Sequence, residues 1–287
     1  MGMKQIGADG WYHRWGLARI IRELVRRYYR HGVSRSSAAL TYYLIFAAFP
    51  LLVFLSMLLG ALQVDPDSVL LIIGPLLPQD VELVVRAYLD YVTDNYSSQL
   101  LWFSLIFSVW FPMRATSCLL FALRRAFGAV YVRQSLKETL LTALFTLWLL
   151  VSWGAAMVLM TVGRRALIYL TGLLHLSRDF ADVWNYLRFA LLGLVMFAAL
   201  AVLYMLAMGS RRPLREVAPG VLISLAAWMT VSAAFSYYVE YVAQYTKLYG
   251  SITTVVVTLL WLYMSGTVLI MGAELNAVLR QRRQHRQ

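Results

Sequence analysis

Six long apolar stretches recur along the whole length of this 287-residue chain, and each is long enough to cross a lipid bilayer. About 20 residues at a rise of 1.5 Å per residue span the hydrocarbon core as a helix. Because lipid offers no hydrogen-bond partners, only helices or closed barrels satisfy the backbone there. The stretches are continuously apolar rather than alternating, which excludes a barrel. The sequence therefore predicts an all-α fold, a polytopic membrane bundle of about six transmembrane helices.

Composition supports this interpretation, since 61% of the residues are hydrophobic and only 14% are charged, against about 25% charged in soluble domains. We expect a basic N-terminal segment (1–35), a transmembrane domain (36–279) with one long outer loop (63–99), and a basic tail (280–287). The N-terminal segment lacks the apolar core and cleavage site of a signal peptide. The expected spans are residues 38–62, 100–123, 139–163, 185–208, 217–242 and 250–279.

Lysine and arginine are distributed unevenly over the connections between these spans. Nineteen of the 26 fall on the side that includes both termini, and five fall on the other side. Positively charged connections stay in the cytoplasm. We therefore expect a multi-pass protein of the bacterial inner (plasma) membrane with both termini cytoplasmic. The net charge of +12 follows from this asymmetry, so it does not indicate nucleic acid as a partner.

The N-terminal segment and the outer loop both have helical spacing of apolar residues. In the first, basic residues from Arg19 to Arg30 share one helix face and apolar residues share the other. This pattern predicts an amphipathic interfacial helix whose partners are anionic lipid headgroups of the bilayer. A regulatory or partner-binding role is the alternative. In the acidic outer loop, residues 81–91 predict a short helix on the outer face.

Charged residues inside the spans are candidates for function, because burying them in lipid costs several kcal/mol. Arg114 lies ten residues before Arg124, about 15 Å from the cytoplasmic end at helical rise. Glu274 lies six residues before Arg280, about 9 Å from the same end. An arginine side chain can bridge this difference in depth, so we expect an Arg114–Glu274 ion pair in the bundle interior. Its role is either structural or that of a gate or substrate site.

A second candidate pair lies at the outer level of the membrane. Arg188 enters the fourth span from outside, and Glu240 leaves the fifth span toward outside. Because both reach the same depth, we expect an outer ion pair between them. A structural role in fixing helix register is the simpler interpretation.

Two prolines fall near the middle of the first and second spans, Pro50 and Pro112. Proline removes a backbone hydrogen bond and kinks a helix, and broken helices at mid-depth are where transporters bind substrates. Polar residues of the first span, among them Tyr42, are candidates for the lining of an inner vestibule. These residues place a candidate substrate or gating site between the first, second and sixth spans.

Signatures of an enzyme are missing from the sequence. None of the four histidines has metal-ligand spacing, and there is no phosphate-binding loop or nucleophile motif. We therefore predict no enzymatic activity, no metal site and no cofactor.

Two end motifs carry a resemblance to a known family. Residues 36–52 read SSAALTYYLIFAAFPLL, and the last span contains YGSITT at 249–254, LLWLYMSG at 259–266 and GAELNA at 272–277. With LRRAFG at 123–128, the chain resembles the YihY/BrkB family of inner-membrane proteins, also labelled ribonuclease BN. The resemblance implies six helices and transport, efflux or envelope-lipid handling. It places Pro50, Glu274 and Asn276 within family motifs.

The leading hypothesis is thus an inner-membrane transporter or exporter for a lipid or a small polar solute. The alternative is a non-transporting membrane scaffold or envelope-integrity factor. Ribonuclease activity is not expected, because no residues could hold a metal or activate water. The sequence identifies no substrate, and it leaves open whether the protein forms a homo-oligomer.

Overall fold

The computed structural model describes residues 17–62, 67, 70, 79–129, 136–174, 179–208, 214–249 and 251–284. Within them the chain is helical apart from short turns. Six helices, α2 and α5 to α9, are long and apolar enough to cross a membrane. The all-α polytopic bundle is therefore confirmed. The helices are α1 (Leu17–Arg30), α2 (Val33–Ala61), α4 (Gln79–Asp94), α5 (Ser98–Ala126), α6 (Leu136–Leu174), α7 (Asp179–Met208), α8 (Leu214–Tyr249) and α9 (Ser251–Gln284).

The helices extend beyond the spans expected from hydropathy. The outer-loop helix expected at 81–91 is present as α4. The helices also extend into the connection between the third and fourth expected spans, because α6 continues to Leu174 and α7 begins at Asp179. Once a helix has formed, each added residue contributes a further hydrogen bond, so a helix does not have to end where the apolar stretch ends.

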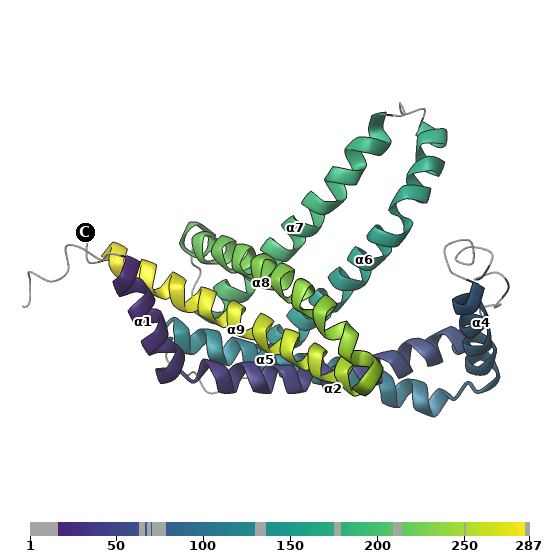
Figure 1. Ribbon diagram of the computed structural model, residues 1–287, viewed down its shortest axis with the longest axis horizontal. Coiled ribbons are helices and arrows are strands. Elements are labelled where there is room, and N and C mark those ends of the chain that lie inside the picture. Colours follow the sequence, from purple (N-terminus) through teal and green to yellow (C-terminus); the bar gives the residue numbers. More distant parts are fainter. Residues whose placement is uncertain are drawn as a thin grey trace, which may run out of the picture.

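Helix α2 is in contact with α1, α4, α5 and α9. It packs along α5 and α9, contacts α1 near its start and is covered by α4 near its end. Figure 1 shows α8 lying along α9, while α6 and α7 form a hairpin that projects away from the other helices. Helices α2, α5 and α9 all contact one another. The predicted meeting of the first, second and sixth spans is therefore confirmed.

The contact between α8 and α9 depends on glycine. A Cβ atom added at Gly272 would lie 1.5 Å from Ser224 Oγ, and one added at Gly220 would lie 2.4 Å from the Cβ of Asn276. Small residues let membrane helices approach this closely. The fully buried Tyr204 of α7 completes this junction, since its hydroxyl donates to the Leu269 carbonyl oxygen at 2.7 Å.

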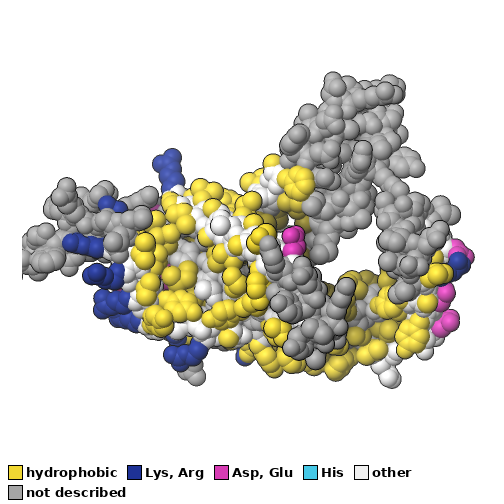
Figure 2. Space-filling view, viewed as in Figure 1, with side chains coloured by type: hydrophobic (Ala, Val, Ile, Leu, Met, Phe, Trp, Pro, Cys, Tyr) yellow, Lys and Arg dark blue, Asp and Glu magenta, His cyan; other side chains and the backbone are white. Residues whose placement is uncertain are grey.

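Charged side chains are segregated along the bundle. Figure 2 shows lysine and arginine gathered at the end that carries α1 and the C-terminus of α9, with a hydrophobic band between this end and the acidic side chains near α4. We call the former the basic end; it comprises α1 and the C-terminal turns of α5 and α9. The basic end is separated from the acidic side chains near α4. This separation agrees with the uneven division of Lys and Arg from which the topology was predicted.

Candidate functional site

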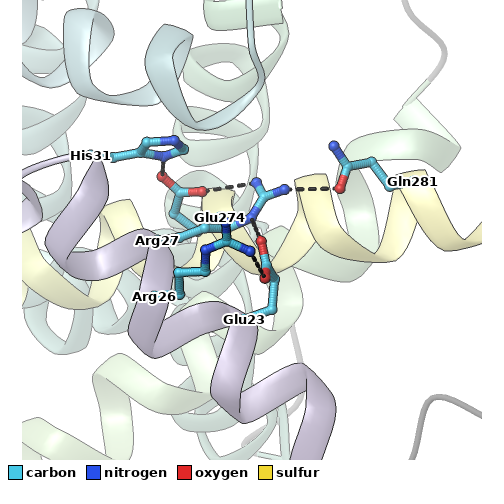
Figure 3. Close-up of polar contacts among 6 residues, drawn as sticks. All are labelled: Glu23, Arg26, Arg27, His31, Glu274 and Gln281. Carbon is cyan, nitrogen blue, oxygen red and sulfur yellow. Dashed lines mark hydrogen bonds and ion pairs between the residues drawn. The ribbon is translucent and has the colours of Figure 1, made fainter.

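A buried carboxylate lies at the basic end. Glu274 of α9 has no solvent exposure, yet no residue of α5 pairs with it. Its Oε2 accepts a hydrogen bond from Nη1 of Arg27 at 3.2 Å, and its Oε1 lies 2.5 Å from Nδ1 of His31 (Figure 3). Both partners come from the N-terminal helix or the turn that follows it. Such a buried carboxylate persists only with charged or hydrogen-bonded partners.

Arg27 itself is 9% exposed and uses all three guanidinium nitrogens. Besides Glu274, it donates from Nε to Glu23 Oε1 at 3.1 Å and from Nη2 to Gln281 Oε1 at 2.8 Å (Figure 3). Glu23 and Arg27 are four residues apart, so they share one face of α1. This face packs on α9, so the prediction that Arg27 points with its neighbours toward lipid headgroups was wrong.

A left-handed glycine directs the chain from α1 into α2. Gly32 has a φ of 64°, a backbone conformation that residues with a Cβ atom rarely adopt. It ends α1 just after His31, and α2 begins at Val33. Nη1 of Arg125, at the C-terminus of α5, donates to the backbone carbonyl oxygen of His31 at 2.9 Å. The turn is thereby tied to α5 while its histidine is tied to α9.

A second glycine shapes the same region from the other side. Gly128, with a φ of 65°, follows α5. The backbone N–H groups of Gly128 and Ala129 donate to the carbonyl oxygens of Arg125 and Arg124 at 3.2 and 3.0 Å. These bonds satisfy carbonyl groups at the helix C-terminus, as glycine-based caps commonly do. The basic pair at the end of α5 is thus held in place by its own cap.

Hydroxyl groups make a further link between α1, α9 and α2. The Tyr28 and Tyr263 hydroxyls are 3.3 Å apart, and Tyr263 donates to Ser34 Oγ at 2.9 Å. The bond with Tyr263, together with burial, raises the pKa of the Tyr28 hydroxyl above its ordinary value. Because tyrosine is neutral below its pKa, this bond favours the uncharged form in which Tyr28 can donate.

The side chains around the Glu274 cluster border a cavity of about 380 Å³. This volume is in the range of small-molecule sites. The wall is strongly basic, with Glu23 as the acidic member among the residues described there. Clustered guanidinium groups suit bidentate binding of phosphate or carboxylate. The lining comprises Glu23, Arg27, Arg30, His31, Arg125, Ala126, Phe127, Gly128, Ala277, Arg280 and Gln281. We call this cavity the basic pocket.

The predicted Arg114–Glu274 ion pair was wrong. Arg114 lies on an exposed face of α5, and its guanidinium carbon lies 5.9 Å from the ring centroid of Tyr43. The adjacent Ala115 and Thr116 are the residues that turn inward. The two charges lie at similar depth but do not meet. Arg114 lies on an exposed face of α5, whereas Glu274 points toward α1.

The remaining candidates for the inner site lie either in contacts between helices or on the surface of the bundle. Neither Pro50 nor Pro112 ends its helix, so the first two spans are not broken at mid-depth. Tyr42 is 52% exposed, packs on Tyr43 and Phe46, and does not line the basic pocket. The buried Asn276 lies against Gly220 of α8, outside the basic pocket, and its Nδ2 has no hydrogen-bond partner in the described part of the chain.

Only one residue of the predicted outer ion pair, Glu240, has a described side chain. Glu240 is exposed near the end of the apolar part of α8. The side chain of Arg188 lies outside the described residues, so the Arg188–Glu240 pair stays a prediction. Among the described side chains, no three of His, Cys, Asp or Glu lie together as metal ligands do.

Arg27 and His31 are the site residues that the sequence reasoning missed. Their spacing of four residues, repeated from Glu23, puts all three on one helix face. That face is a candidate partner for the one acidic residue inside the last span. An interfacial helix can turn one of its arginines toward the bundle instead of toward lipid, as Arg27 does.

A polytopic α-helical membrane protein with a basic pocket at one end of its bundle is the class that this fold and site define. Residues 24–287 match the family described as virulence factor BrkB. The chain therefore belongs to the BrkB family, which confirms the resemblance of its end motifs.

Three bacterial proteins are similar to the chain over most of its length. The chain is 29% identical over 263 residues to a "putative ribonuclease-like protein YfkH" of Bacillus subtilis strain 168, covering 92% of this chain and 96% of that protein. It is 27% identical over 275 residues to a "UPF0761 membrane protein" of Chromohalobacter salexigens, covering 93% of this chain and 64% of that protein. A Pseudomonas aeruginosa UPF0761 protein is 27% identical over 260 residues, covering 88% of this chain and 61% of that protein.

The chain thus spans nearly all of the Bacillus relative and less than two thirds of these two UPF0761 proteins. No solved structure matches it.

Proposed function

We propose that the protein is a bacterial inner-membrane transporter or exporter of a small anionic solute or a lipid, with the basic pocket as its cytoplasmic substrate site. The observation that carries the proposal is that Arg27 and His31 both line this pocket and both hold the buried carboxylate of Glu274. The mid-membrane Arg114–Glu274 centre is replaced by this cluster.

The cluster supplies a way to couple substrate binding to helix movement. A phosphate or carboxylate in the pocket competes with Glu274 for Arg27 and His31. A buried carboxylate that loses its partners is destabilised by several kcal/mol, so it must move toward water or toward another partner. Either event weakens the contact of α1 with α9. Substrate thereby favours a second arrangement of the bundle, as alternating access requires.

The orientation is part of the proposal. The basic end faces the cytoplasm, because positively charged segments are retained there. Substrate then enters from the cytoplasm, which suits an exporter.

Flux into proteoliposomes tests the proposal. The probes are radiolabelled phosphate, glycerol 3-phosphate and a fluorescent phosphatidylglycerol. We expect protein-dependent movement of at least one probe, reduced about tenfold or more in Arg27→Gln and Glu274→Gln, since each removes a charge-assisted hydrogen bond. Arg86→Gln is the matched control, because Arg86 pairs with Asp67 at the opposite end of the molecule. Equal flux in all four folded proteins would contradict the assignment, as would no flux of any probe.

A non-transporting scaffold or envelope-integrity factor is the second candidate. It is favoured by a second face of α1, where Ile21, Val25 and Tyr29 are 54%, 52% and 75% exposed. This stripe can enter the bilayer or bind a partner. Replacing all three residues with serine leaves Glu23 and Arg27 in place. A scaffold should lose cellular function in this variant, whereas a transporter should keep its flux in proteoliposomes.

A further inference from the structure

His31 uses one ring nitrogen to contact the buried carboxylate of Glu274. Its side chain is 19% exposed and borders the basic pocket. Nδ1 lies 2.5 Å from Glu274 Oε1, and Figure 3 shows Nδ1 as the ring nitrogen that faces this carboxylate. The other ring nitrogen, Nε2, has no hydrogen-bond partner among the residues that the structure describes. Nε2 is therefore available to a ligand at the wall of the pocket.

Hydrogen bonds hold the backbone of His31 on both sides of the residue. Its N–H donates to the Arg27 carbonyl oxygen at 2.8 Å, and its own carbonyl oxygen accepts from Nη1 of Arg125 at 2.9 Å. Because Glu274 also engages Nδ1, the imidazole ring has little freedom to turn. The bond at one ring nitrogen determines the role that is left to the other nitrogen. Here the remaining role is that of Nε2 toward the pocket.

The charged groups around His31 respond differently to pH. Arginine stays protonated throughout the range in which proteins function. The carboxylate on the pocket wall, Glu23, is paired with Arg27. Histidine is the side chain that ordinarily changes its charge between pH 5 and pH 8. The described charged groups that face His31 are Glu23, Arg27 and Arg30 of α1, Arg125 of α5, and Glu274 and Arg280 of α9.

The protonation state of the imidazole decides whether Nε2 can bind an anion. A neutral imidazole has one donor nitrogen and one acceptor nitrogen. When Nδ1 donates to Glu274, the lone pair of Nε2 repels an anion. A second proton turns Nε2 into a donor while Nδ1 continues to donate. An anion in the pocket also offsets the repulsion between this proton and the four arginines of the wall. Proton and anion therefore strengthen each other's binding.

We propose that His31 is a proton-dependent ligand of the basic pocket, so that an anion with a phosphate group binds together with a proton. The proton comes from solvent and is held on Nε2, which donates to the anion, while Nδ1 keeps its bond with Glu274. The anion and Glu274 then share one imidazolium charge, which is how they compete for His31. This inference rests on the proposed function, because it takes the pocket as the anion site.

Isothermal titration calorimetry of the full-length protein in detergent, with sulfate as the probe, tests the proposal. Sulfate stays a dianion over the pH range used, so a pH dependence of binding comes from the protein. The Kd should rise about tenfold or more between about pH 6 and about pH 8, since one linked proton changes an affinity by at most about tenfold per pH unit. Titrations in two buffers of different ionisation enthalpy measure proton uptake, which should reach at most about one proton per sulfate.

Two variants of His31 remove the proton and keep a hydrogen-bond donor. His31→Asn has an amide near the position of Nδ1, and His31→Gln has one near the position of Nε2. Both should bind sulfate equally well at the two pH values, without proton uptake. Arg30→Gln is the matched control, because it removes a permanent charge from the pocket wall. It should weaken binding by a similar factor at both pH values and keep the proton uptake.

The possible outcomes separate this inference from the proposed function. Sulfate binding by the wild type that is independent of pH and takes up no proton would overturn the inference, while the pocket would remain an anion site. Unchanged proton uptake in the His31 variants would place the proton on another group, such as Glu23 or Glu274, and would also overturn it. A wild type that binds no sulfate at either pH would contradict the proposed function as well.

The source of the phosphate group is decided by competition with sulfate. Glycerol 3-phosphate and dihexanoylphosphatidic acid carry the same phosphate monoester, and the second adds two short acyl chains. Stronger displacement of sulfate by glycerol 3-phosphate would support a soluble anion, and stronger displacement by the phosphatidic acid would support a lipid headgroup. If neither compound displaces sulfate, the pocket does not bind phosphate groups and the inference is wrong.

Discussion

Arg27 of α1 donates a hydrogen bond to Glu274 of α9 across 247 residues of sequence, with Nη1 and Oε2 3.2 Å apart. Both side chains are buried. The bond joins the first described helix to the last and holds His31 beside the same carboxylate. Helix α1 is therefore part of the bundle at the level of this site, rather than an anchor that contacts only lipid.

Breaking this pair from one side should destabilise the protein. Arg27→Met leaves Glu274 with His31 alone, and loss of one partner of a buried pair costs about 3 kcal/mol. The double variant Arg27→Met/Glu274→Gln removes both charges and should recover much of that loss. Thermal unfolding in detergent, followed by tryptophan fluorescence, measures both. If the double variant is as unstable as the sum of the two single variants, the two side chains do not interact.

Gly272→Ala should disrupt the junction of α7, α8 and α9. The added methyl group would lie 1.5 Å from Ser224 Oγ and 2.8 Å from the Tyr204 hydroxyl. We expect a loss of more than about 2 kcal/mol, typical of overpacking in a close contact. Gly193→Ala in α7 is the matched control, because nothing lies within 4 Å of its added Cβ. The control should unfold at or above the wild-type temperature, since alanine favours helix more than glycine does. Equal melting temperatures for the two variants would refute this account.

Gly32→Ala should strain the turn that positions His31. A left-handed backbone costs alanine about 1 kcal/mol, whereas asparagine tolerates it better. We therefore expect α1 to be cleaved faster by trypsin in Gly32→Ala than in Gly32→Asn, with the wild type slowest. A reversed order of the two variants would show that the left-handed conformation does not hold α1 in place.

Gly32→Ala should also lower flux if the basic pocket is the substrate site, because its histidine moves relative to Glu274. Measuring proteolysis and flux on the same preparations separates the two effects. Faster cleavage with unchanged flux would argue against a role for His31 in transport.

The proposed orientation predicts a labelling pattern. In a Cys118→Ser background, which removes the one native cysteine, a new cysteine at Arg22 or Asp94 reports opposite ends of the bundle. A membrane-impermeant maleimide should label Asp94→Cys in spheroplasts and Arg22→Cys only after lysis. The inverse pattern would show that the basic end faces outward and that the charge rule fails here.

Much of the architecture could be predicted from the sequence, because lipid imposes a simple rule on the backbone. Long apolar stretches must be helical, so the six spans and α4 were recognisable from hydropathy and helical spacing. The depth of each charged residue also follows from helical rise. On that basis Glu274 was identified as a candidate for the functional site, and it does lie in the charged cluster at the basic end.

What the sequence by itself determined was therefore which segments are helical, how deep each charge lies and how the basic residues divide between the two sides. The tertiary structure alone decided which charges meet. Rotation of a helix about its own axis is set by packing, here by Gly272 against Ser224 and by the buried side of α5. That rotation turns Glu274 toward Arg27 and His31 and leaves Arg114 on an outer face, because side chains at equal depth can point in opposite directions.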